Sequence, residues 1–205
     1  MGNQSSRILE DAIEAFASLP GIGKKTALRL ALYCIYQPKS KLEKFNSAIE
    51  NLGSELKFCK KCHHISDYDT CHICSDLKRD HKVICLVESI RDVLAIEDTG
   101  HYKGLYHVLG GVISPIDGVG PDDLNIPTLL DRCKGADIEE VIMGISPTID
   151  GETTIYYLSR CLQEAGITKI SILARGVAFG GELEYADEMT LGRSIRARLP
   201  YQLTE

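Results

Sequence analysis

The segment FCKKCHHISDYDTCHIC, residues 58–74, decides how the middle of the chain folds, because it holds four cysteines in two Cys-x-x-Cys pairs. Thiolates are soft ligands that suit tetrahedral zinc, and two such pairs complete its coordination shell. Four protein ligands leave no open position for water or substrate, so we expect one structural zinc ion per chain. The expected ligands are Cys59, Cys62, Cys71 and Cys74. The neighbouring His63, His64 and His72 are alternative ligands, but the symmetry of the two pairs favours sulfur alone.

The composition is that of a folded intracellular protein. Of the 205 residues, 44% are hydrophobic and 25% are charged, which suits one or two domains with a buried core. No run of about 18 apolar residues occurs, and no basic start leads into an apolar block, so we expect neither a membrane span nor a secretory signal. In a reducing compartment two disulfides in the loop are disfavoured. We expect the remaining cysteines to be buried, reduced thiols; these are Cys34, Cys85, Cys133 and Cys161.

Charge is distributed unevenly along the chain, whose formal net charge is −6. Residues 1–80 carry 12 Lys and Arg against 10 Asp and Glu, whereas residues 81–205 carry 11 against 19. Within residues 20–61 the imbalance sharpens to nine basic against three acidic side chains. We therefore expect an anionic partner to bind in the N-terminal part of the chain.

The first 57 residues are expected to form a small helical domain. Apolar residues recur at helical spacing over residues 7–19, 25–36 and about 40–57. The segment LPGIG, residues 19–23, interrupts the first two helices, and Pro38 ends the second. The pattern predicts two helices joined by a tight hairpin, followed by a third helix.

The hairpin and the helix after it form a candidate anion site. Gly21 and Gly23 let the backbone approach a phosphate closely, and the free amides at the next helix start favour negative charge. Lys24, Lys25 and, one turn later, Arg29 add full positive charges. This arrangement resembles the helix-hairpin-helix motif, which binds the DNA backbone without reading sequence. The alternative is an ordinary Pro-Gly turn between two helices.

After the cysteine loop, short apolar runs alternate with helical segments. We expect strands at residues 83–88, 106–111, 140–145 and 169–174. Helices are expected from Ser89, where Asp92 completes a capping box, to Gly100, over residues 151–166, and after Asp187. Such alternation predicts a mostly parallel sheet flanked by helices, here in a domain of residues 80–175 with a helical segment at 176–205. The chain as a whole is therefore a multi-part α+β protein, with the cysteine loop, residues 58–76, between its two larger domains.

Carboxylates lie where ligands usually bind in such sheets. Glu88 ends the first predicted strand, and Asp150 and Glu152 follow the third. This segment resembles the Toprim fold of topoisomerases and primases, whose catalytic members hold magnesium with a strand-end glutamate and an Asp-x-Asp pair. The positions that match the pair are Ser146 and Thr148, which puts metal-dependent catalysis in doubt. The three carboxylates then form an acidic face that contacts a partner or magnesium, or they only cap helices and carry surface charge.

Two further segments are distinctive: VESIRDVLAIEDTGHYKGLYHVLGGVISPIDGVGPDDL, residues 87–124, and ARGVAFGGELEYADEMTLGRSIRAR, residues 174–198. Together with the hairpin, the cysteine loop and the Toprim-like segment, in that order, they make the chain resemble the bacterial RecR family of recombination mediators. The resemblance covers about residues 7–198.

The resemblance to this family carries several expectations. It implies a non-enzymatic DNA-repair protein that works with RecO and RecF to load RecA onto gapped DNA, in the cytoplasm and associated with the nucleoid. It implies a ring-shaped homotetramer that clamps single- or double-stranded DNA through backbone contacts. By position, Lys25 and Arg29 match the DNA-contacting pair of the family, and the four cysteines match its zinc ligands.

Two other functions remain open from the sequence. The first is a magnesium-dependent Toprim enzyme of the topoisomerase, nuclease or primase type, which would need more carboxylates near Glu88. The second is a transcription regulator that reads DNA sequence through the cysteine loop. Lys60 and Lys61 are basic, but the intervening HHISDYDT, residues 63–70, is short and acidic, which disfavours base readout.

Overall fold

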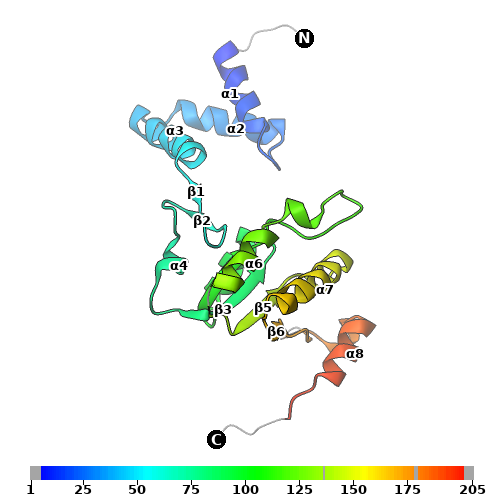
Figure 1. The fold of residues 1–205 in the computed structure, drawn as a ribbon. Helices are drawn as coiled ribbons and strands as arrows, with labels where there is room; N and C mark the ends of the chain where they lie inside the picture. The colour runs from blue at the N-terminus through cyan, green and yellow to red at the C-terminus, as the bar shows by residue number, and fades with distance from the viewer. Residues whose placement is uncertain (1–5, 136, 178–179, 201–205) are drawn as a thin grey trace, which may run out of the picture. The chain divides into compact units, whose positions relative to one another are not determined.

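The chain forms two compact units, Met1–Leu56 and Lys57–Glu205 (Figure 1). The structure, a computed structural model, describes residues 6–135, 137–177 and 180–200. The outer ends of the predicted first and last domains, residues 1–5 and 201–205, lie outside the described residues. Among the described residues, no helix combines the length and the apolar character needed to cross a membrane.

The first unit contains three helices, as the periodicity predicts. They are α1 (Arg7–Ala17), α2 (Lys24–Ile35) and α3 (Lys39–Ser54), and each predicted start lies within one residue of the observed one. Helices α1 and α2 pack against each other across the hairpin. Within the described part of this unit only Ala27 and Ala31 are buried, because most large apolar side chains of the three helices face outward.

The second unit is built on a four-stranded sheet. Strands β3 (Asp80–Val87), β4 (Gly104–Val108), β5 (Glu140–Gly144) and β6 (Lys169–Ile172) pair in the order β4-β3-β5-β6. All three neighbouring pairs are parallel, so the predicted strand and helix alternation is confirmed.

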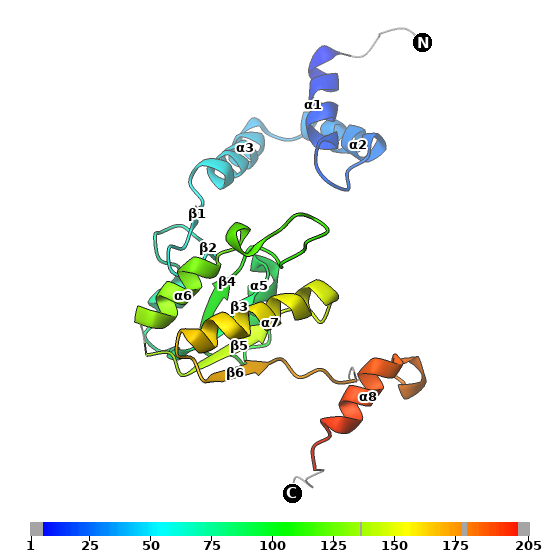
Figure 2. The same cartoon turned by 45° about the vertical axis from the view of Figure 1, so that its right-hand side comes forward.

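Helices cover both faces of this sheet. They are α5 (Ile90–Asp98), α6 (Ile126–Gly135) and α7 (Ile149–Glu164), and Figure 2 shows α6 and α7 on one face and α5 on the other. A further helix, α8 (Glu188–Arg196), follows the last strand, after Asp187 as predicted. The predicted capping box at the start of α5 is confirmed, because the amide of Ser89 donates to the Asp92 carboxylate at 2.8 Å.

The side chains of the central strand β3 alternate between two core clusters, one on each face of the sheet. Its Ile84 and Leu86 pack in one cluster with residues of α6 and α7. Its Cys85 and Val87 face the opposite side and pack in a second cluster with Val93 of α5. The side-chain period of two along a strand explains this division. The second cluster also contains the four cysteines of the loop, so the loop and the sheet share one core.

Two sequence expectations need correction. Helix α6 was not predicted, although Ile126, Leu129 and Cys133 follow helical spacing and are buried. The prediction that all four single cysteines are buried was wrong for Cys34 and Cys161, which are only partly buried. Cys34 on α2 lines an apolar pocket with Phe16 and Leu42, and this pocket leaves it partly open.

Candidate functional site

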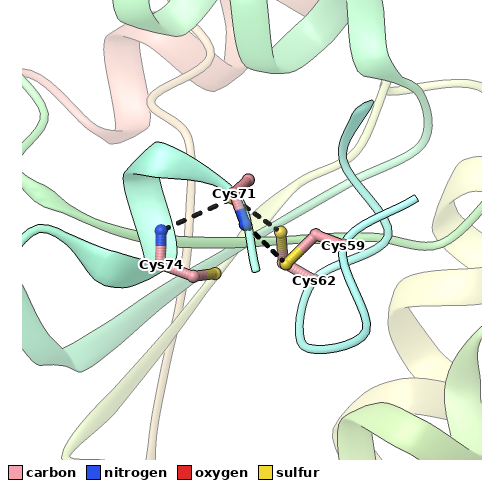
Figure 3. A group of neighbouring side chains, drawn as sticks. All are labelled: Cys59, Cys62, Cys71 and Cys74. Carbon is pink, nitrogen blue, oxygen red and sulfur yellow. Dashed lines mark hydrogen bonds between the residues drawn. The ribbon is translucent and has the colours of Figure 1, made fainter. Parts of the chain in front are cut away.

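The four loop cysteines converge as a metal site requires (Figure 3). Their sulfur atoms lie within 4.8 Å of one another, all four residues are buried, and none is in a disulfide. Zinc bound to four thiolates at about 2.3 Å places the sulfurs about 3.8 Å apart, and the Sγ atoms of Cys62 and Cys71 are already 3.5 Å apart. Among the described residues this is the one group of three or more His, Cys, Asp or Glu side chains close enough to hold an ion. The donor set therefore fits zinc.

Local structure fixes both cysteine pairs. The short strands β1 (Lys57–Phe58) and β2 (Ile65–Ser66) pair antiparallel and bracket the first pair. The amide of His63 donates to the carbonyl of Cys59 at 2.9 Å, which closes the turn and leaves His63 at a φ of 61°. The second pair begins at Cys71, the residue that precedes helix α4 (His72–Ser75). Backbone amides thus orient the sulfurs before any ion binds.

Hydrogen bonds within the cluster favour the thiolate form of Cys71. The Cys71 sulfur accepts a hydrogen bond from the Cys74 amide at 3.5 Å, and the Cys59 sulfur accepts one from the Cys71 amide at 3.3 Å. The hydrogen bond between the Cys62 and Cys71 sulfurs lowers the pKa of Cys71 well below its ordinary value and raises the pKa of Cys62. Zinc requires thiolate ligands, so its binding would release the protons of the remaining thiols.

The three loop histidines lie outside the group of ligand atoms. His63 pairs through Nε2 with the Thr128 hydroxyl at 2.8 Å, on helix α6. His64 is buried, and this burial lowers its pKa. His72 packs edge-on against the His64 ring. The first contact attaches the loop to helix α6, and the second lies within the loop.

The hairpin of the first unit presents an open, positively charged helix start. The amide of Ile22 donates to the carbonyl of Leu19 at 3.1 Å, and Gly21 has a φ of 79°, which only glycine adopts without strain. Gly23 precedes α2 and has no side chain to cap its amides. A Cβ built on either glycine meets no atom within 4 Å, so the surface in front of the hairpin is open.

The three predicted cations stand beside these amides. Lys24 and Lys25 lie in the first turn of α2 and Arg29 one turn later, and all three are exposed. The first turn contains no acidic residue, and none of the three cations has an ion-pair partner in the described part of the chain. Helix dipole, free amides and unpaired cations all favour an anion here.

Two of the three acidic residues of the sheet edge, Glu88 and Glu152, have internal partners. Glu88 accepts a hydrogen bond from the amide of Ser146 at 2.5 Å, which joins the end of β3 to the connection between β5 and α7. Asp150 and Glu152 lie in the first turn of α7, where a helix dipole stabilises carboxylates. Glu152 forms ion pairs with Arg175 and, at 3.9 Å, with Arg193. Glu88 and Ser146 are thus brought together, whereas Glu152 is directed to arginines.

Ser146 and Thr148 both lie against the backbone of Gly151, at the start of α7. The Thr148 hydroxyl accepts a hydrogen bond from the amide of Gly151 at 3.0 Å and so caps α7. A Cβ on Gly151 would lie 2.0 Å from the carbonyl oxygen of Ser146, so the turn closes only around glycine. The sequence did not indicate this close approach.

These features define a class of protein: a Toprim-type α/β unit with a four-cysteine finger, preceded by a helix-hairpin-helix unit. Family models match in the same order. They are the RecR helix-hairpin-helix model over residues 9–52, the RecR four-cysteine zinc finger domain over 56–76, the Toprim domain over 82–174 and the RecR C-terminal model over 176–198.

Curated relatives match over nearly the full chain. The protein named "Recombination protein RecR" in Porphyromonas gingivalis W83 is 53% identical over 197 residues, which are 96% of this chain and 95% of the relative. The protein of the same name in Phocaeicola vulgatus is 54% identical over 190 residues, 93% of this chain and 92% of the relative. That of Cytophaga hutchinsonii is 50% identical over 204 residues, 99% of each. The chain belongs to the RecR family, which confirms the resemblance drawn from its motifs.

Proposed function

We propose that the protein is a sequence-independent DNA-binding scaffold and clamp in recombinational repair. The observation that carries this proposal is the open start of α2, where Lys24, Lys25 and Arg29 are exposed without carboxylate partners in the described part of the chain. Lysine and arginine beside free amides bind phosphate oxygens, which carry no sequence information. Apart from the two lysines, residues 19–25 of the hairpin contain no polar side chain that could contact base edges, so DNA of any sequence should bind.

Family membership supports the biological context. The relatives are named recombination proteins, and we propose that this chain acts with RecO and RecF to promote RecA loading on gapped DNA. Its site of action is then the cytoplasm, in association with the nucleoid, because that is where its DNA substrate lies. The acidic face of Glu88, Asp150 and Glu152 is our candidate for contact with a protein partner.

One zinc ion per chain is proposed to have a structural role. Four buried sulfurs supply the complete shell of ligands, so no position remains for a substrate. The cysteines also belong to the core cluster of β3, β4 and α5. Bound zinc would therefore stabilise the finger against the sheet, with Cys59, Cys62, Cys71 and Cys74 holding it.

We further propose that the protein works as a homotetramer. The first unit leaves many large apolar side chains exposed, among them Ile8, which is 82% exposed, and Tyr36, which is 84% exposed. Large exposed apolar patches mark interaction surfaces. We propose that a second copy of the chain buries these apolar side chains. The number of four subunits in a ring is what the family resemblance implies.

Catalysis at the Toprim edge is not part of this proposal. Ser146 and Thr148 stand where catalytic Toprim proteins have Asp-x-Asp, and hydroxyl groups do not supply the charge that magnesium needs at a phosphoryl transition state. Glu88 accepts the Ser146 amide. We propose a structural or partner-binding role for this carboxylate.

Two measurements on the purified protein test the proposal. Single strands, duplexes and gapped duplexes should be tested with several random sequences each. Within each of these forms the affinity should not depend on the sequence, and it should weaken steeply with salt. Mass measurement of the protein with and without DNA should show four copies. Strong preference for one sequence, or a monomer at all concentrations, would contradict the clamp.

A further inference from the structure

A second basic cleft lies in the unit Lys57–Glu205, beside the zinc finger. The cleft has a volume of about 400 Å³ and is lined by the finger, the start of β3 and helix α6. Its polar lining residues are Lys60, Lys61, His81, Thr128 and Arg132. We refer to it as the finger cleft. The sequence motifs include only its finger side, with Lys60, Lys61 and Cys74, because α6 was not predicted.

The walls of the finger cleft are held in fixed positions. The Arg132 guanidinium donates to the carbonyl of Tyr106 on β4 at 2.8 Å and to the carbonyl of Lys61 on the finger at 3.4 Å. The amide of Val108 donates to the carbonyl of Cys62 at 2.8 Å. These bonds connect finger, sheet and helix, so the backbone that carries the lysines has little freedom.

The finger cleft concentrates positive charge in an acidic part of the chain. No Asp or Glu of the described residues lines it, although residues 57–205 as a whole carry 23 acidic against 16 basic side chains. Lys60 has a carboxylate partner, Asp69, at 2.5 Å. Lys61 has no ion-pair partner among the described residues, and Arg132 is bonded there only to neutral carbonyls. Two positive charges therefore remain uncompensated at the cleft.

The lining indicates which anion fits. Arginine and lysine donors bind phosphate oxygens well, and Arg132 keeps N–H groups that have no partner in the described part of the chain. The apolar lining residues are aliphatic, Leu105 and Ile138, and the described lining offers no Phe, Tyr or Trp ring on which a base could stack. A phosphate group fits this lining, whereas a nucleobase does not.

We propose that the finger cleft binds a phosphate of the DNA backbone, as a contact separate from the hairpin. The inference rests on the proposed DNA-binding function and extends it, since the finger then contributes to DNA affinity as well as to stability. It assigns Lys61 and Arg132 as phosphate-binding residues.

Salt titrations of DNA binding test the assignment. Lys61→Gln keeps the backbone carbonyl that Arg132 contacts and removes only the charge. With a labelled single-stranded oligonucleotide, loss of one phosphate contact should lower the slope of log K against log salt by about 0.7 and the affinity roughly fivefold near 0.1 M salt. The control Lys134→Gln removes the same charge from the exposed last turn of α6, outside the cleft, and should bind like the wild type. Retention of zinc in both variants shows that the finger is intact.

The outcomes distinguish this inference from the proposed DNA-binding function on which it rests. If Lys25→Gln lowers the slope but Lys61→Gln does not, the finger cleft is not a DNA contact and the hairpin proposal stands. If the wild-type protein binds no DNA, both proposals are wrong. Inorganic phosphate and a mononucleotide distinguish the source of the phosphate. Either compound could raise the melting temperature of the wild type but not of Lys61→Gln, while the salt slope of DNA binding is the same in both proteins. That result would show a site for free anions and contradict the DNA assignment.

Discussion

The backbone amide of Val108 donates a hydrogen bond to the carbonyl of Cys62 at 2.8 Å, which joins the first cysteine pair to the end of strand β4. The finger is therefore not a separate domain, because it is hydrogen-bonded to the sheet. Its four cysteines pack with Cys85, Val87 and Val93 in one buried cluster. Zinc binding and the stability of the sheet should consequently be coupled.

The first prediction concerns this coupling. Cys59→Ser combined with Cys62→Ser should abolish zinc binding and lower the melting temperature by at least about 10 °C, because the shared core loses the constraint that holds the finger. Calorimetry and metal analysis measure both effects. Cys34→Ser, a single partly buried cysteine of the other unit, is the control and should keep its zinc. A double variant with wild-type metal content and melting temperature would contradict the structural role.

The second prediction concerns the buried imidazole of His107 on β4. Burial lowers the pKa of His107 to about 4, while Nε2 contacts the carbonyl of Asn125 at 2.8 Å. The unfolded chain binds a proton near pH 6.5, so between about pH 6.5 and 4 the unfolded state holds more protons and stability falls as pH falls. Above this window the buried His107 has no such effect on stability. Below it, the difference in protonation lowers the free energy of unfolding by about 3 kcal/mol.

Urea unfolding of the wild type and of His107→Gln across this window measures the effect. The difference in unfolding free energy between the two proteins should shrink as the pH falls from 6.5 toward 4. Comparison with the variant removes the separate effect of acid on the zinc ligands. A difference that is constant over this range would show that His107 is not held neutral by the fold.

The third prediction concerns the turn that closes α7. Gly151→Ala should destabilise the protein by about 2 kcal/mol or more, because its Cβ would lie 2.0 Å from the carbonyl oxygen of Ser146. Gly53→Ala is the matched control, since a Cβ there meets nothing within 4 Å and Gly53 lies in helix α3. Alanine at that position should be neutral or stabilising by up to about 1 kcal/mol. Equal unfolding curves for the two variants would refute the packing argument.

The fourth prediction concerns catalysis at the Toprim edge. Neither the wild type nor Glu88→Ala should nick, relax or prime DNA in the presence of magnesium, because positions 146 and 148 carry hydroxyl groups. Instead, Glu88→Ala should lower stability slightly, since the Ser146 amide loses its acceptor. Magnesium-dependent turnover that disappears in Glu88→Ala would establish the enzymatic alternative.

Much of the architecture follows from the sequence because its signals are local. Paired Cys-x-x-Cys turns, the Pro-Gly hairpin and short apolar runs each act within a few residues, and the observed strands start and end within three residues of their predicted bounds. Helix α6 was missed because it lies after the long connection that follows β4, although it is no shorter than the predicted α5 and α8.

Contacts between distant segments could not be read from the sequence. The bond from Ser146 to Glu88 and the bridge from Arg132 to Lys61 join residues at separations of 58 and 71 positions. Such pairs depend on the order of the strands and on how the finger packs. The finger cleft depends on the second of these contacts, so it is visible only in the fold.

Binding by the hairpin is the central claim, and one salt titration tests it most directly. The variant Lys25→Gln with Arg29→Gln should lower the slope of log K against log salt by about 1.5 and the affinity more than roughly tenfold near 0.1 M salt, equally for different DNA sequences. The control Lys39→Gln lies in the same unit, where Glu43 at 3.6 Å already pairs with this lysine, and should be unchanged. A double variant that binds DNA with the wild-type slope and affinity would contradict the account.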